Sequence, residues 1–230
     1  MSIDPELIKF LILFISILVL SFGINSFLLA SIGGIYRLFV APGVILHELS
    51  HAFACFFTGT KVTSINMFKK EGGEVRHARS KIPILGPIVI SLAPFLVGGV
   101  AIYFFSRFMG LQALDISEFS LNPAEFIETI KQSFIGIELN DVTNWVLLYL
   151  ALSIAVTMIP SLRDFANIIV SLILAGIIIF LVYRYTPFRF DPGWVLRPEL
   201  FIVMGAVVAL LIVSLILSII IYAIKLVVST

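Results

Sequence analysis

Two histidines and a glutamate stand close together in one apolar stretch of the chain, His47-Glu48-Leu49-Ser50-His51. Residues four apart on a helix lie on one face, so His47 and His51 can present imidazole nitrogens to one ion, a geometry that suits tetrahedral zinc. Glu48 stands beside the first histidine, where its carboxylate can take a proton from an activated water and later hand it to a leaving amine. The pattern therefore predicts one zinc ion per chain and a hydrolytic reaction with Glu48 as the base.

A catalytic zinc site needs a third protein ligand and keeps its fourth position for water. We expect Asp164 to be that ligand, because it follows the helix break predicted at Pro160 and stands at a membrane boundary. The alternative is a surface salt bridge between Asp164 and Arg163. His77 is a second candidate ligand, and the acidic residues near it are weaker ones: Glu71 and Glu74.

The composition places this chemistry in a lipid bilayer. The chain has 230 residues, of which 60% are hydrophobic and 13% charged, and its mean hydropathy is +1.13. About 20 apolar residues cross the ~30 Å hydrocarbon layer as a helix, which satisfies its own backbone hydrogen bonds. The net charge of +1 argues against a nucleic-acid partner. The bilayer itself is therefore the expected surrounding.

The segment pattern predicts an all-α polytopic membrane protein with about six transmembrane helices and a small membrane-associated β-hairpin. The polar stretch from Thr60 to Lys81 carries the predicted hairpin, with a glycine turn at Gly72-Gly73. We expect one membrane-embedded domain over residues 1–230, with the motif-bearing part at about 36–170. The predicted spans are Lys9–Ala30, Ile35–Phe57, Ile82–Phe105, Asn144–Ile159, Phe165–Tyr183 and Leu200–Ala223.

The location of the histidines strengthens the functional interpretation. An ionisable side chain in the middle of a spanning helix costs at least ~2.5 kcal/mol on insertion scales, and such residues usually mark function. The alternative is a polar hydrogen-bonding cluster in a transporter or scaffold. Lysines and arginines are concentrated in the 60–81 loop, which predicts that this loop and both termini are cytoplasmic. The cell membrane is the expected location.

Four segments resemble the site-2 protease family of intramembrane zinc metalloproteases. They occur in the order VILHELSHAFACFFTG, EGGEV, GPIVISLAP and TMIPSLRDFAN. The resemblance implies that His47, His51 and Asp164 bind zinc, that Glu48 is the base, and that the substrates are transmembrane segments of other proteins. It also implies a hairpin beside the active site.

The fourth segment, TMIPSLRDFAN, departs from the family pattern, which opens with asparagine where this chain has Thr157 and has glycine where this chain has Phe165. The Pro160-to-Asp164 spacing is also one residue shorter than expected. In the family the asparagine is expected to hold the substrate or the oxyanion. Here that role falls to Thr157 or, as alternatives, to Asn167 or Asn144.

The hairpin has a physical role of its own in this hypothesis. A peptide bond inside a helix is shielded by backbone hydrogen bonds, and an open strand edge offers partners to an unwound segment. Gly72 and Gly73 are therefore candidate substrate-binding residues, and the alternative is an ordinary connecting loop.

Two rival functions remain open. One is an HExxH membrane protease of the prenyl-protein or quality-control type, whose third ligand is a downstream glutamate such as Glu125, Glu128 or Glu138. The other is a non-catalytic zinc-binding membrane protein or a transporter, in which Glu48→Gln would leave function intact. The sequence does not indicate the oligomeric state.

Overall fold

A computed structural model describes residues 5–69, 72–110, 123–135, 137–138, 140–158, 162–186 and 197–228. Pro160 and Glu71, named above, lie outside these residues. The secondary structure of the described residues is helical except for one two-stranded sheet. Its elements are α1 (Pro5–Ile32), the 3₁₀ helix η1 (Gly33–Ile35), α2 (Tyr36–Phe39), α3 (Ala41–Phe57), β1 (Val62–Lys69), β2 (Gly72–His77), α4 (Leu85–Phe108), α5 (Pro123–Ile135), α6 (Val142–Thr157), α7 (Leu162–Tyr185) and α8 (Pro198–Val228).

The predicted fold class is confirmed, and each of the six predicted apolar segments contains a long helix. The second segment differs in detail, because η1, α2 and α3 replace the single helix expected over Ile35–Phe57. The break falls at Val40, just before Pro42. Proline has no N–H to continue the α2 hydrogen bonds, but it is well accepted in the first turn of a new helix.

Among the described residues, three helices are long and apolar enough to cross a membrane: Pro5–Phe39, Leu85–Phe108 and Glu199–Val228. The apolar helices α3 and α6 have 17 and 16 residues. At 1.5 Å per residue each is about 25 Å long, which is shorter than the ~30 Å hydrocarbon layer. The apolar length and composition indicate an integral membrane protein, while the orientation of the chain stays a prediction.

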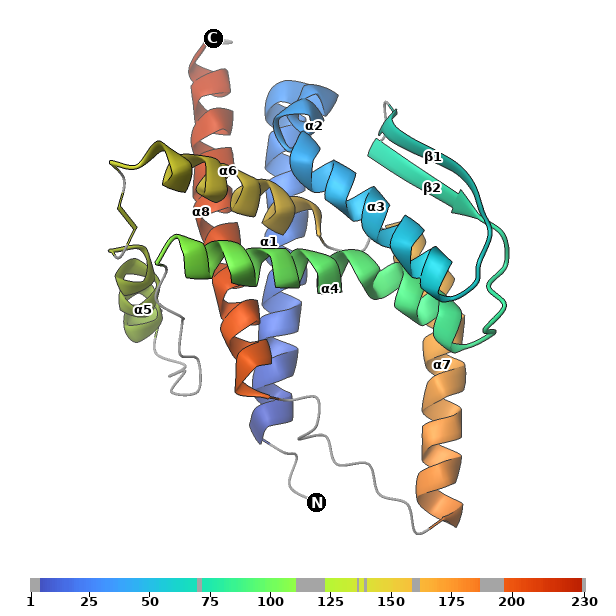
Figure 1. Ribbon diagram of the computed structural model, residues 1–230. Coiled ribbons are helices and arrows are strands. Elements are labelled where there is room, and N and C mark those ends of the chain that lie inside the picture. The colour runs from blue at the N-terminus through green and yellow to red at the C-terminus, as the bar shows by residue number, and fades with distance from the viewer. Residues whose placement is uncertain are drawn as a thin grey trace.

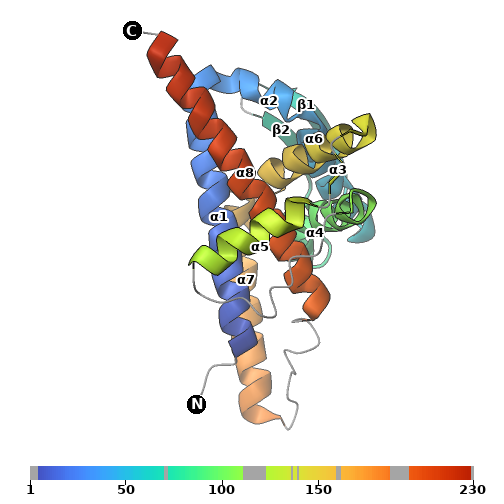
Figure 2. The same ribbon diagram turned by 90° about the vertical axis from the view of Figure 1, so that its left-hand side faces the viewer.

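The helices lie in two directions. Helices α1 and α8 pack along each other, and α4 and α6 run across them (Figure 1 and Figure 2). The main apolar core lies where α1, α4, α6 and α8 meet. Helix α3 contacts α4, α6 and both strands, and α7 contacts α4. This packing surrounds α3, which carries the histidines, with elements that are distant in the sequence.

The predicted β-hairpin is present. Strands β1 and β2 pair antiparallel, with Ile65 opposite Val75 and Asn66 opposite Glu74. The predicted glycine turn is wrong in one respect, because Gly72 and Gly73 begin β2 instead of forming the turn. The physical reason concerns Gly73, which lies against a side chain of α3 where there is no space for a Cβ.

Candidate metal centre

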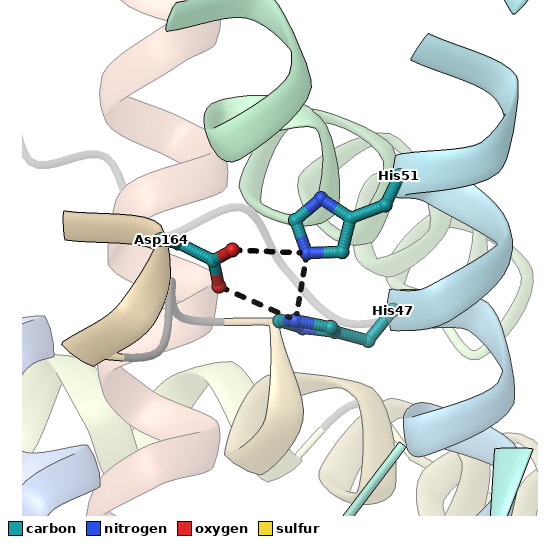
Figure 3. A group of neighbouring side chains, drawn as sticks. All are labelled: His47, His51 and Asp164. Carbon is teal, nitrogen blue, oxygen red and sulfur yellow. Dashed lines mark hydrogen bonds and ion pairs between the residues drawn. The ribbon is translucent and has the colours of Figure 1, made fainter. Parts of the chain in front are cut away.

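The side chains of His47, His51 and Asp164 converge on one point (Figure 3). The histidines project from α3, and the aspartate comes from the first turn of α7. The two Nε2 atoms lie 3.2 Å apart, and the Asp164 carboxylate oxygens lie 3.5 Å from His51 Nε2 and 3.9 Å from His47 Nε2. The side chains of His47, His51 and Asp164 are only 11%, 7% and 13% exposed.

These distances suit one tetrahedral ion. Zinc binds nitrogen and carboxylate oxygen at about 2.0–2.2 Å, so neighbouring ligand atoms of a tetrahedron lie about 3.3–3.6 Å apart. The separations of 3.2 and 3.5 Å are close to this range, and the separation of 3.9 Å is slightly longer. A small movement of the Asp164 side chain would complete the geometry.

The hydrogen bonds of the imidazole rings decide which nitrogen is free. His47 Nδ1 donates to the Thr157 carbonyl at 2.6 Å, and His51 Nδ1 donates to the Ile90 carbonyl at 2.8 Å. A carbonyl oxygen can only accept, so both Nδ1 atoms carry hydrogen, and in a neutral ring Nε2 then has a lone pair. Two lone pairs and a carboxylate therefore face one another in a buried site. This donor set fits a divalent cation, and it fits zinc by ligand type.

The position of His47 depends on the close packing of α3 against α6. The Gly43 N–H donates to Ser153 Oγ at 2.9 Å, and Thr157 Oγ1 donates to the Ser153 carbonyl at 2.9 Å. A Cβ at Gly43 would overlap both the Ser153 carbonyl and the Thr157 hydroxyl. Thr157 is the last residue of α6, so no residue within the helix donates to its carbonyl, which is available to His47.

Glu48 is held between α3 and the hairpin. Its side chain is buried, and a Cβ at Gly73 would lie 2.5 Å from Glu48 Oε1 and 2.6 Å from Cδ. The carboxylate also interacts electrostatically with the Val75 backbone, His51 and Asp164. Glu48 therefore lies beside the cluster of ligand atoms without being one of them.

The other candidate ligands lie elsewhere. His77 ends β2, opposite Val62, and its Nδ1 donates to the Ala78 carbonyl at 2.9 Å. Glu74 pairs with Arg76 at 3.1 Å. Neither residue belongs to the group of possible ligands found among the described residues. The side chain of Arg163, the alternative partner of Asp164, lies outside what is described, and so does the side chain of Asn167.

The predicted substrate-binding polar residues have mixed positions. Thr157 lies at the site, but its hydroxyl is engaged with the α6 backbone. Asn144 lies near the other end of α6, where its amide donates to the Glu138 carbonyl at 2.9 Å. At 1.5 Å per residue, 13 residues of helix place Asn144 about 20 Å from Thr157. Asn144 therefore cannot take over the role considered for Thr157.

The glutamates of the rival protease hypothesis are also distant. Glu125 and Glu128 are exposed on α5, which lies at the far end of α4 from the hairpin and α7 (Figure 1). The Glu128 carboxylate accepts from Gln132 at 2.8 Å and pairs with Lys131 at 3.4 Å. These contacts hold the pKa of Glu128 below its ordinary value. They make it a solvated surface carboxylate instead of a zinc ligand.

Residues 13–113 match the family model described as Peptidase M50B-like. The match runs from α1 to the end of α4 and includes the two histidines, Glu48 and the hairpin, but it ends before Asp164. It confirms the resemblance to the site-2 proteases and supports a membrane metallopeptidase of that general type. Comparisons with curated proteins and with solved structures gave no match.

The residues that orient the two histidines were not predicted. Ile90 and Thr157 act through their backbone carbonyls, which every residue type has, so the sequence does not reveal them. Gly43 and Ser153 are residue types that are common in apolar helices. Pro94 is a signal that the sequence does contain, because a proline inside a helix leaves one carbonyl without its usual donor.

Proposed function

We propose that this protein is an intramembrane zinc metalloprotease that hydrolyses peptide bonds within transmembrane segments of other membrane proteins. One observation carries the proposal: Nε2 of His47, Nε2 of His51 and the Asp164 carboxylate converge beside the buried Glu48. The Peptidase M50B-like match supports the class of enzyme. The position of the site within apolar helices supports cleavage at membrane depth.

In this proposal His47, His51 and Asp164 would hold one zinc ion, as three protein ligands do in catalytic zinc sites. When bound, zinc supplies a Lewis acid that polarises the substrate carbonyl and brings the pKa of a coordinated water to about 7. The carbonyls of Thr157 and Ile90 keep both imidazole rings turned with Nε2 towards the ion. Burial of the three side chains keeps bulk water away from the ligands.

Glu48 is the proposed general base and then the general acid. Its carboxylate accepts a proton from the attacking water and delivers it to the amide nitrogen as the C–N bond breaks, so the products are a carboxylate and an amine. The packing of Gly73 against Glu48 restricts the directions that the carboxylate can take. The base is thereby held next to the metal ligands.

Strand β2 is the proposed binding surface for the substrate backbone. Strand β2 contacts α3, and Gly73 at its start lies directly against the Glu48 side chain. An unwound substrate segment could add to the sheet beside β2 as a further strand, which would supply partners for the N–H and C=O groups freed from its helix. Gly72 and Gly73 begin this strand, and the missing Cβ of Gly73 makes room for the Glu48 side chain.

We take residues 1–230 as a single membrane-embedded protease domain, with its motifs at about 36–170. Cleavage of a spanning helix would release a fragment from the membrane, which is the expected output of regulated intramembrane proteolysis. The bilayer of the cell membrane is the proposed location. The 60–81 loop and both termini are proposed to face the cytoplasm, because basic residues gather in that loop.

The test combines metal content with cleavage. We would purify the parent in detergent together with His47→Ala, Glu48→Gln and Asp164→Ala, measure zinc per chain, and follow cleavage of a single-span substrate in reconstituted vesicles. We expect about one zinc in the parent and in Glu48→Gln, loss of zinc in the other two, and loss of cleavage in all three. Glu125→Gln, which changes an exposed carboxylate of α5, is the matched control and should keep both properties.

The same assay separates the rival functions. Cleavage of a prenylated soluble peptide but not of the spanning helix would favour the prenyl-protein type of protease. Zinc in the parent without cleavage of either substrate, or with full activity in Glu48→Gln, would favour a zinc-binding protein or transporter. A parent without zinc would contradict the proposal, and unchanged zinc in Asp164→Ala would remove Asp164 from the ligand set.

A further inference from the structure

Helix α4 continues through Pro94, which is fully buried. Proline has no backbone N–H, so the carbonyl four residues earlier loses its helical donor, and the proline ring also pushes that carbonyl aside and bends the helix. The carbonyl concerned is that of Ile90. A buried carbonyl without a partner is unfavourable, so the Ile90 oxygen requires a donor from outside α4.

That donor is His51. Its Nδ1 lies 2.8 Å from the Ile90 oxygen. Helices α3 and α4 are held together at this level by a small buried cluster, Ala54, Cys55, Ile90 and Ala93. The single α4 carbonyl that Pro94 leaves without a helical donor is therefore the carbonyl that meets the second histidine of the site.

We propose that Pro94 is a positioning residue for the metal centre. By withholding its N–H, Pro94 leaves the Ile90 carbonyl free to accept from His51, and this bond fixes the ring with Nε2 directed to the metal. The inference rests on the proposed zinc site. Hydrogen-bond partners of metal-binding histidines typically change metal affinity or activity about 10–100-fold when they are lost, and we expect an effect of this size at Pro94.

The test uses two substitutions that differ in one property. Pro94→Ala and Pro94→Gly both restore an N–H that competes for the Ile90 carbonyl, but glycine leaves the helix free to bend. Pro87→Ala is the matched control, because Pro87 lies in the first turn of the same helix and the residue four positions before it, Pro83, precedes the helix. The readouts are zinc affinity, measured by competition with a chelator, and the absorption spectrum of the cobalt-substituted protein.

We expect zinc affinity to fall about 10–100-fold in both Pro94 variants, with a changed cobalt spectrum, and to stay at the parent value in Pro87→Ala. Parent-like affinity and spectrum in both Pro94 variants would overturn the inference. A loss of zinc affinity in Pro94→Ala alone would assign the effect to the shape of the helix and would also overturn the inference. An equal loss in Pro87→Ala would indicate a general disturbance of α4, with the same consequence.

If Pro94→Ala does not fold, Pro94→Gly decides the question, because glycine also tolerates a bent helix. Failure of this inference is distinct from failure of the proposed function. If the parent protein binds no zinc, the proposed metal site itself is wrong. If the parent and both Pro94 variants bind zinc with equal affinity, only the role of Pro94 is wrong.

Discussion

Gly73→Ala should displace the base, Glu48, and leave the metal ligands in place. The added Cβ would lie 2.5 Å from Oε1 and 2.6 Å from Cδ of Glu48, whereas carbon atoms in good contact lie about 3.5–4.0 Å apart. The carboxylate must therefore move by about 1 Å, and a misplacement of this size can reduce a rate 10²-fold. Gly73 contributes no metal ligand, so zinc should remain bound.

The expected result is a fall in kcat on the order of 10²-fold with about one zinc retained per chain. Overpacking of a buried contact costs about 1–3 kcal/mol, so a moderate fall in thermal stability is also expected. Gly176→Ala is the matched control, because nothing lies within 4 Å of a Cβ at that position of α7. A Gly73→Ala protein with parent kcat would refute the proposed approach of β2 to the base, and loss of zinc would place the effect on the ligands.

Three further predictions concern the support of the site. Ser153→Ala leaves the buried Gly43 N–H without its acceptor and should lower the free energy of unfolding by about 1–3 kcal/mol, measurable as a lower melting temperature. His77→Ala should leave zinc content unchanged, and a loss of zinc would return His77 to the candidate ligands. Removal of zinc with a chelator should lower the melting temperature, because an ion present at 100 times its Kd stabilises the folded state by about 2.7 kcal/mol; an unchanged melting temperature would indicate that the parent carries no zinc.

The parts of the site that lie within one helix were predictable from the sequence. The spacing of His47 and His51 places them on one face of any helix, and the apolar surroundings indicate that this helix is embedded in the protein or in lipid. Asp164 was a harder prediction, because it reaches the histidines only through the packing of α7 against α4. The predicted helix break supplied the hint in that case, and its role as a ligand stays a prediction.

The contacts between elements could not be predicted. Two adjacent glycines between polar residues are typical of a turn, and only the position of Glu48 explains why Gly73 belongs to the strand. The lengths of α3 and α6 show a similar limit. Hydropathy identified both segments, but the start of α3 depends on Pro42, and neither helix reaches the full thickness of the hydrocarbon layer.

The orientation of the two histidines shows how distant parts of the chain are coupled. Each ring is fixed by a carbonyl from a different helix: His47 by Thr157 at the end of α6, and His51 by Ile90 in α4. In both cases the carbonyl is available because its own helix supplies no donor, at a terminus in α6 and before a proline in α4. A metal ion joining α3 to Asp164 of α7 would therefore hold four helices in register. Metal affinity should consequently respond to substitutions that disturb these two carbonyls, such as those at Pro94 in α4, although they touch no ligand, whereas Gly73→Ala in β2 should act on the base and leave the metal bound.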